Sequence, residues 1–128
     1  MPRLAVLVDD EQTLRAYVSA VLHQGGFSVI EAADGSDALA LVRQMRGCVD
    51  VLVTDVKMPR MTGIDLVTCV KIDFPDIPIL YMSGEPLQES LHNPRSRVLF
   101  LQKPFGPQAF LDAVRTVVAP VDANPVAG

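Results

Sequence analysis

The segment Leu4-Ala-Val-Leu-Val-Asp-Asp10 decides how the rest of the sequence is interpreted. Its five consecutive apolar residues have the length and composition of a strand that is buried on both faces, and an acidic pair follows directly. Similar apolar runs recur at Val49 to Val53, Ile77 to Met82 and Val98 to Leu101. A further run, Phe27 to Ala32, alternates more between polar and apolar residues, which is typical of a strand near a sheet edge. The sequence therefore predicts five strands.

Between these runs the apolar residues change to helical spacing. Four stripes of this kind predict helices, at Leu14 to Leu22, Ala38 to Met45, Leu66 to Phe74 and Phe110 to Val118. Strands that alternate with helices form right-handed crossovers, which give a parallel sheet with helices on both faces. We therefore predict an α/β fold.

Local signals indicate where several of these helices begin and end. Thr62, followed three residues later by Asp65, resembles a capping box, and Gly25-Gly26 is expected to close the first helix. Pro107 suits the first turn of the last helix. Between Glu85 and Arg97, two prolines leave room for only a short or irregular fourth helix.

The composition limits the classes of function. A chain of 128 residues suits one domain, which we expect over residues 1–118, with a tail or linker over 119–128. A net charge of -4 argues against direct binding of nucleic acid. No apolar run approaches the roughly 20 residues that cross a bilayer, so we expect a cytoplasmic protein without membrane insertion. Cys48 and Cys69 have no metal-ligand or redox spacing and are expected to be reduced and mostly buried.

Four of the five predicted strands run into a polar or charged residue. Asp9 and Asp10 come just after the first strand, Asp55 after the third, Ser83 after the fourth and Lys103 after the fifth. In an open parallel sheet these strand ends share one edge, where ligands bind, so the five side chains are expected to converge. Taken singly, each acidic residue also has an ordinary explanation as a helix cap or a turn residue.

Three converging carboxylates repel one another unless a proton or a cation offsets their charge. Mg²⁺ binds one or two carboxylates, retains waters and leaves positions for phosphate oxygens, so it suits a cluster of Asp9, Asp10 and Asp55. Lys103 adds a positive charge for a carboxylate or phosphoryl oxygen, and Ser83 adds a hydroxyl donor. No histidine or glycine-rich phosphate loop lies near these positions, which leaves a carboxylate as the evident nucleophile and an aspartyl phosphate as its product.

The residues around these positions resemble a known family. The stretches that carry the resemblance are Val8-Asp-Asp-Glu11, Asp55-Val-Lys-Met-Pro59 with Gly63, Met82-Ser-Gly84, and Lys103-Pro-Phe105. They resemble the response-regulator receiver domains of bacterial two-component systems, in the expected order over residues 3 to 118. The resemblance implies a flavodoxin-like fold with strand order 2-1-3-4-5. It also implies a cis Lys103–Pro104 bond, although most X-Pro bonds are trans.

The resemblance further implies a phosphorylation switch with Asp55 as the phosphoacceptor. The donor would be a histidine kinase or a histidine phosphotransfer protein. Asp10 and Asp55 would bind Mg²⁺ through their side chains, Lys57 through its main-chain carbonyl, and Asp9 through a water molecule. The protein would then be a substrate more than an enzyme.

Three further residues receive roles by the same resemblance. Ser83 and Lys103 would contact the phosphoryl oxygens. Phe100 occupies the aromatic switch position and would turn inward when Ser83 moves, although a phenylalanine within a strand is also explained as plain core.

Lys57 and Glu85 flank the path of attacking water, and we hypothesise that they pair and slow dephosphorylation.

Two other classes of function compete with this interpretation. A binding module that works without phosphorylation is expected to lack the acceptor, the acidic pair or the lysine, all of which are present. A small hydrolase with Asp55 as nucleophile would need a general acid and a substrate lid. Residues 100–107 favour the receiver of a hybrid histidine kinase over two alternatives, a stand-alone regulator and a receiver cut from a larger regulator. The sequence does not specify the downstream partner.

Overall fold

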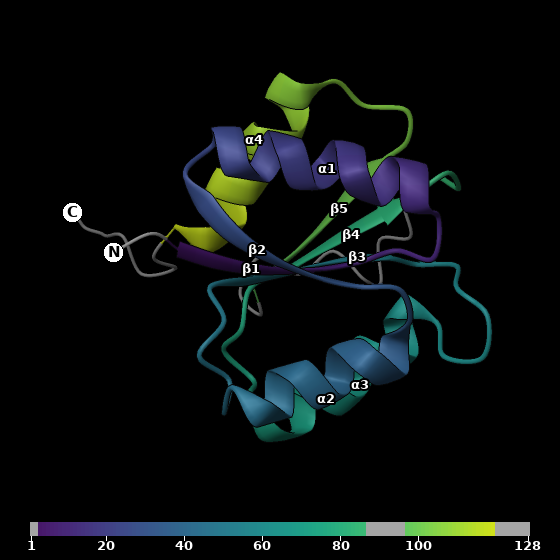
Figure 1. Ribbon diagram of the computed structural model, residues 1–128, viewed down its shortest axis with the longest axis vertical. Helices are drawn as coiled ribbons and strands as arrows, with labels where there is room; N and C mark the ends of the chain where they lie inside the picture. Colours follow the sequence, from purple (N-terminus) through teal and green to yellow (C-terminus); the bar gives the residue numbers. More distant parts are fainter. Residues whose placement is uncertain (1–2, 87–96, 120–128) are drawn as a thin grey trace.

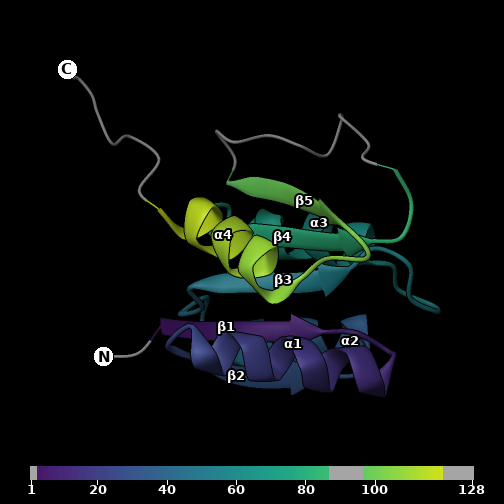
Figure 2. The ribbon, with the colours of Figure 1, turned by 90° about the horizontal axis from the view of Figure 1, so that it is seen from above.

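Five parallel strands form the central sheet of the computed structural model, which describes residues 3–86 and 97–119. The strands are β1 Arg3–Val8, β2 Phe27–Ala32, β3 Val51–Asp55, β4 Ile79–Ser83 and β5 Val98–Gln102. Their order is β2-β1-β3-β4-β5, as Figure 2 shows, and every neighbouring pair is parallel. The predicted five-stranded α/β fold and the strand order implied by the family resemblance are confirmed.

Four helices of the described residues cover the two faces of the sheet. They are α1 Gln12–Gln24, α2 Gly35–Gln44, α3 Gly63–Asp73 and α4 Pro107–Val118. Helices α1 and α4 lie on one face, and α2 and α3 lie on the other (Figure 1). The short or irregular helix expected between Glu85 and Arg97 falls mostly outside the described residues. The helix labelled α4 therefore corresponds to the one predicted at Phe110 to Val118. No helix in the described ranges is long and apolar enough to cross a membrane.

The continuous apolar runs arise because both faces of the sheet are buried. In β1, Val6 and Val8 contribute to the cluster under α2 and α3, while Ala5 and Leu7 contribute to the cluster under α1 and α4. All four side chains are fully buried. Because each fully buried valine or leucine contributes on the order of 1.5 to 3 kcal/mol, β1 is fixed firmly between its neighbours β2 and β3.

The predicted beginnings of two strands were wrong. Val49 and Ile77 are buried, but each lies two residues before its strand. The amide of Val49 donates to the Gly47 carbonyl at 2.8 Å, so it belongs to a turn instead of the strand ladder. Pro78 follows Ile77 and has no N–H to donate. Burial alone therefore extended both predicted strands too far.

The predicted helix ends are confirmed where specific cap chemistry was available. Thr62 and Asp65 form the reciprocal capping box at the beginning of α3. Gly25 ends α1 and Gly26 follows with φ +92°, a backbone conformation that favours glycine. Pro107 stands in the first turn of α4. These caps fix the loops next to the helix ends, including the loop between β3 and α3.

The prediction of mostly buried cysteines was wrong. Cys48 is exposed and Cys69 is half-buried, and both are free thiols. Cys48 follows the end of α2 in a turn. On α3 the buried stripe consists of Gly63, Leu66, Val67 and Val70, so the inner face is centred on Val67 and passes beside Cys69.

Candidate functional site

The three predicted carboxylates converge at the carboxyl edge of the sheet. Asp9, Asp10 and Asp55 each offer one carboxylate oxygen, and these atoms lie within 4.8 Å of one another. Asp9 is 0% exposed and Asp55 is 8% exposed, whereas Asp10 is open to solvent. Burial raises the pKa of both Asp9 and Asp55, because removal from water disfavours the ionised form. The site therefore combines dense negative charge with poor hydration.

Hydrogen bonds from three neighbouring segments hold three of the four polar atoms of Asp9. Its amide donates to the Ala32 carbonyl at 3.2 Å, and its Oδ1 accepts from the Glu11 amide at 2.9 Å. Its carbonyl accepts from Arg15 at 2.7 Å. Its Oδ2 is buried and has no hydrogen-bond partner within the described ranges. A buried carboxylate oxygen without a partner is costly, and a cation satisfies it.

Asp55 is the last residue of β3, and a cationic partner contacts it directly. Its Oδ1 lies 3.2 Å from Lys103 Nζ and accepts from the Val56 amide at 3.1 Å. Burial has the larger effect on the pKa of Asp55 and raises it, while Lys103 acts in the lowering direction. Lys103 is itself partly buried, so solvent screens this ion pair less than it screens a surface pair. The predicted convergence of Asp55 and Lys103 is present.

The chain leaves Asp55 through a closely packed loop. The Gly63 amide donates to the Val56 carbonyl at 2.8 Å, and a Cβ at Gly63 would collide with the Asp55 carbonyl oxygen. Only glycine allows the first turn of α3 to approach the strand end this closely. The capping box of α3 begins one residue earlier, so the loop is held at both of its ends.

Ser83 and Lys103 are joined through the main chain. The Lys103 amide donates to the Ser83 carbonyl at 2.7 Å, which continues the pairing of β4 with β5 beyond the strand ends. The Ser83 hydroxyl accepts from the Glu85 amide at 3.0 Å and is almost fully buried. Because a hydroxyl donates and accepts at once, its proton remains for another acceptor. The Lys103–Pro104 bond is cis, as the family resemblance implied.

Lys57 and Glu85 form the ion pair that was hypothesised. Lys57 Nζ lies 2.7 Å from Glu85 Oε2, and both side chains are exposed. The hydrogen bond from Lys57 lowers the pKa of the Glu85 carboxyl group. The pair thus bridges the loop after β3 and the end of β4, two residues beyond Asp55 and Ser83 respectively.

Phe100 lies in β5 beside a buried tyrosine of β4. Tyr81 and Phe100 are register partners, and their ring centroids are 6.4 Å apart with a tilt of 45°. Burial raises the pKa of Tyr81 to about 12, so its hydroxyl stays protonated at neutral pH. Phe100 is only partly buried, although it packs against the cluster under α2 and α3.

The sequence analysis missed two residues of the site. Arg15 on α1 contacts the Asp9 carbonyl through Nη1 and Glu31 through Nε. Glu31 belongs to β2, where it is the register partner of Leu7. The spacing offered one usable signal, because Arg15 stands one helical turn after Glu11 and so lies over the acidic loop.

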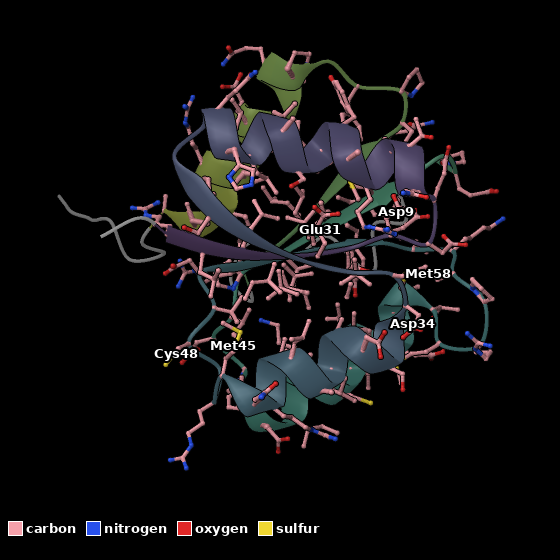
Figure 3. The ribbon with its side chains drawn as sticks, viewed as in Figure 1. Asp9, Glu31, Asp34, Met45, Cys48 and Met58 are labelled. Atoms are coloured by element: carbon pink, nitrogen blue, oxygen red, sulfur yellow. The ribbon has the colours of Figure 1, made fainter. Side chains whose placement is uncertain are left out.

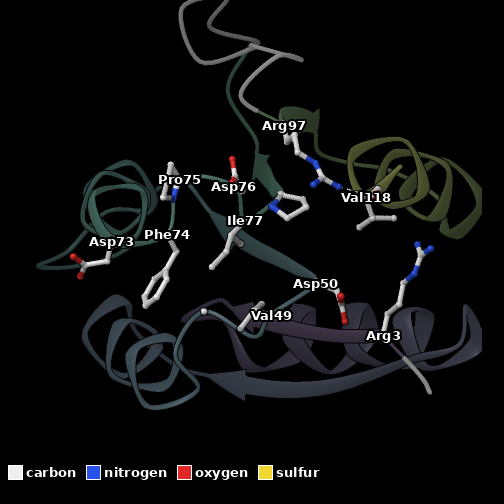
Figure 4. Close-up of a pocket in the computed structure, with 12 residues that line it drawn as sticks. Arg3, Val49, Asp50, Asp73, Phe74, Pro75, Asp76, Ile77, Arg97 and Val118 are labelled. Carbon is white, nitrogen blue, oxygen red and sulfur yellow. Dashed lines mark hydrogen bonds between the residues drawn. The ribbon is translucent and has the colours of Figure 1, made fainter. Parts of the chain in front are cut away.

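A separate pocket of about 510 Å³ opens at the opposite edge of the sheet (Figure 4). Its lining carries both signs of charge, with Arg3 and Arg97 opposing Asp50 and Asp76. None of the site residues predicted from the sequence lines it. The mixed charges do not favour an anionic or a cationic ligand, so the candidate chemistry stays at the carboxyl edge.

Comparison with known families identifies the chain. Residues 5–115 match the model of the response regulator receiver domain. The chain belongs to this family. Receiver domains are signalling modules of two-component systems, and as a family they bind Mg²⁺ at an acidic site and interact with histidine kinases or phosphotransfer proteins.

Individual relatives differ greatly in length. The sensor kinase CckA of Brucella abortus is 32% identical over 119 residues, which cover 91% of this chain and 13% of that protein. The chemotaxis protein CheY of Pseudomonas aeruginosa is 32% identical over 117 residues, which cover 88% of this chain and 93% of that protein. This receiver domain therefore corresponds to a small part of the kinase but to nearly all of CheY.

Solved structures agree with the fold. CheY4 of Vibrio cholerae has a TM-score of 0.79 at 32% identity, covering 91% of this chain and 99% of that chain. The receiver domain of the hybrid histidine kinase CckA has a TM-score of 0.76 at 28% identity, covering 90% of this chain and 98% of that chain. The same flavodoxin-like receiver fold thus occurs both alone and inside larger kinases.

Proposed function

We propose that this receiver domain accepts a phosphoryl group on Asp55 from a phosphohistidine donor and changes its conformation in response. The observation that carries the proposal is the convergence of three carboxylates at one strand edge, with Lys103 Nζ 3.2 Å from Asp55 Oδ1. In the transfer, a carboxylate oxygen of Asp55 forms a bond to phosphorus while the bond from phosphorus to the donor imidazole breaks. The donor histidine recovers its lone pair.

The residues of the acidic cluster fit a divalent cation. The buried Oδ2 of Asp9 lacks a partner in the described part of the chain, and two further carboxylates lie close by. Asp10 and Asp55 would hold Mg²⁺ through their carboxylates, Lys57 through its main-chain carbonyl and Asp9 through water. When bound, Mg²⁺ supplies positive charge that offsets the carboxylates and the incoming phosphoryl oxygens. Asp55 thereby stays ionised despite its burial, as a nucleophile must.

Lys103 and Ser83 would bind the phosphoryl group once it is on Asp55. Lys103 already contacts Asp55, and its ammonium has further donors for a phosphoryl oxygen. Ser83 retains its hydroxyl proton, because its oxygen is the acceptor in its bond with the Glu85 amide. Movement of Ser83 toward the phosphoryl group would shift the end of β4.

Phe100 would report this movement by changing its packing. The ring is half-buried beside Tyr81, so a more buried position gains apolar contact. Phosphorylation then changes the relative populations of two arrangements of the surface formed by β4 and β5. The switch role of Phe100 rests on this position and on its spacing from Lys103.

The ion pair between Lys57 and Glu85 would slow loss of the phosphoryl group. Hydrolysis needs a water molecule to reach phosphorus opposite the Asp55 oxygen. The pair bridges the segments on either side of this approach, and its distance of 2.7 Å leaves no gap between the charged groups. Separation of the two side chains would therefore precede attack by water.

The donor would be a histidine kinase or a histidine phosphotransfer protein in the cytoplasm. Likeness to CckA supports a receiver within a hybrid kinase, and likeness to CheY supports a stand-alone regulator. The resemblance of residues 100–107 favours the first setting. We assign the receiver to residues 1–118, with no direct role in binding nucleic acid. The tail or linker expected over 119–128 falls almost entirely outside the described residues.

Intact mass measurement tests the acceptor chemistry. The wild-type chain is incubated with acetyl phosphate, with Mg²⁺ or with EDTA, beside an Asp55→Asn variant. We expect one phosphoryl group on the wild type with Mg²⁺ only, removable by hydroxylamine, and none on the variant. If neither acetyl phosphate nor a phosphohistidine donor labels the wild type, the proposal fails, and a binding module that works without phosphorylation becomes the better interpretation.

A further inference from the structure

We infer that Arg15 is a positioning residue for Mg²⁺ binding, and that Glu31 holds Arg15 in place. The inference rests on the proposed function, because it concerns the same acidic site. Neither side chain belongs to the carboxylate cluster. Arg15 contacts the loop that carries Asp9 and Asp10, and Glu31 acts through Arg15, so their effect is on the geometry of the metal ligands.

The contacts of Arg15 link three separate elements. From α1, its Nη1 donates to the Asp9 carbonyl at 2.7 Å, and its Nε donates to Glu31 Oε1 at 3.1 Å on β2. Figure 3 labels Asp9 and Glu31, which both lie on the α1 side of the sheet. One guanidinium thus connects the first turn of α1, the loop after β1 and the edge strand. A planar fork with several donors makes both contacts at fixed angles.

Arg15 contacts the main chain of Asp9 and not its carboxylate. Arg15, the Ala32 carbonyl and the Glu11 amide bond to three polar atoms of Asp9. Among the residues that the structure describes, only Oδ2 of Asp9 is then left without a partner. With its amide, carbonyl and Oδ1 all fixed, Asp9 has one orientation for the remaining oxygen. The following residue, Asp10, begins from the same fixed carbonyl, so its direction also depends on Arg15.

Burial distinguishes this pair from an ordinary surface ion pair. The Arg15 side chain is 17% exposed, although it carries a full charge. The chain offers a matched surface pair, Arg43 with Asp73, at 3.7 Å with side chains 56% and 48% exposed. Arg43 lies on α2, on the other face of the sheet, and belongs to neither the acidic loop nor its contacts. It therefore serves as a control for the loss of an arginine in an ion pair.

The experiment measures Mg²⁺ affinity by calorimetric titration of the metal-free chain with MgCl₂. The variants are Arg15→Ala, Arg15→Lys, Glu31→Ala and the control Arg43→Ala. Loss of groups that orient metal ligands typically weakens affinity by about 10 to 100 times, so we expect about tenfold weaker binding in Arg15→Ala. Arg15→Lys should also weaken binding, because one ammonium does not span both acceptors. The Mg²⁺ affinity of Glu31→Ala should lie between that of the Arg15 variants and that of the wild type. The affinity of Arg43→Ala should equal that of the wild type.

A second measurement separates positioning from general loss of structure. Phosphorylation of Asp55 by acetyl phosphate is followed against Mg²⁺ concentration, with folding verified by circular dichroism. In Arg15→Ala the half-saturating Mg²⁺ concentration should rise about tenfold, while the rate at saturating Mg²⁺ should stay near that of the wild type. If Arg15→Ala does not fold, Arg15→Lys and Glu31→Ala provide the same comparison.

The outcomes are distinguishable. Wild-type affinity in folded Arg15→Ala overturns the inference and leaves the proposed function intact. Weak binding in Arg15→Ala with wild-type binding in Arg15→Lys also overturns it, because charge alone would then suffice. Absence of Mg²⁺ binding by the wild type overturns the proposed metal site and this inference together.

Discussion

Replacing Asp9 by asparagine should stabilise the metal-free protein and remove most of its stabilisation by Mg²⁺. The cluster places carboxylate oxygens within 4.8 Å of one another. At an effective dielectric constant of about 20, two unit charges at that distance repel by about 3.5 kcal/mol. Attraction between Asp9 and Lys103 offsets part of this repulsion, so we expect a net gain of about 1 to 3 kcal/mol in the free energy of unfolding at neutral pH. Asparagine keeps an oxygen for the Glu11 amide.

Urea unfolding of wild type and Asp9→Asn, in EDTA and with saturating Mg²⁺, measures both effects. At a free Mg²⁺ concentration of about 100 times its Kd, the wild type should gain about 2.7 kcal/mol. The variant should gain far less, because it lacks one of the three charges that attract the ion. Asp112→Asn, at an exposed carboxylate of α4, controls for the change in net charge. A variant that is less stable than wild type in EDTA, or that responds equally to Mg²⁺, would refute the reasoning.

Three further predictions concern pH, the phosphorylated state and the loop after β3. Burial raises the pKa of Asp9 and Asp55, so the folded state binds their protons more tightly than the unfolded chain does. In EDTA, the free energy of unfolding measured with urea should therefore fall as the pH rises from the unfolded-state pKa of these groups through their higher folded-state pKa. Lys57→Ala and Glu85→Ala should each shorten the acyl-phosphate lifetime severalfold when the loss of the phosphoryl group is followed by intact mass, and unchanged lifetimes would contradict the water-blocking role. Gly63→Ala should lower the free energy of unfolding by about 3 kcal/mol, because a Cβ collides with the Asp55 carbonyl, and a loss near zero would show that the loop can move.

The fold was predictable because its signals are local and repeated. Both faces of β1 are buried, so its segment is a continuous apolar run, and the sequence between strands changes to helical spacing. The strand order came from resemblance to the family, since periodicity does not specify which strands are neighbours. Strand beginnings were less accurate, because Val49 and Ile77 are buried like strand residues while their amides bond within turns.

The candidate site was predictable only as a set of residues. Parallel strands end at one edge, so Asp9, Asp55 and Lys103 could be expected to meet. The identity of the atom left without a partner, Asp9 Oδ2, required the structure, because three neighbours occupy the rest of that residue. Arg15 was missed because a charged residue early in a helix is ordinarily solvated, and its spacing from Glu11 places it near the acidic loop without identifying the carbonyl that it contacts.

The pairing of the Lys103 amide with the Ser83 carbonyl bears on when the site comes into existence during folding. Asp9 follows the first strand and Lys103 follows the last, so no continuous fragment that stops short of β5 contains the cation that faces Asp55. Parallel pairing between distant segments is slow compared with local helix formation. A chain still emerging from the ribosome would present the acidic pair and the acceptor before their lysine is in place. The proposed capacity to accept a phosphoryl group on Asp55 would therefore depend on the completed sheet, because Lys103 joins the site last.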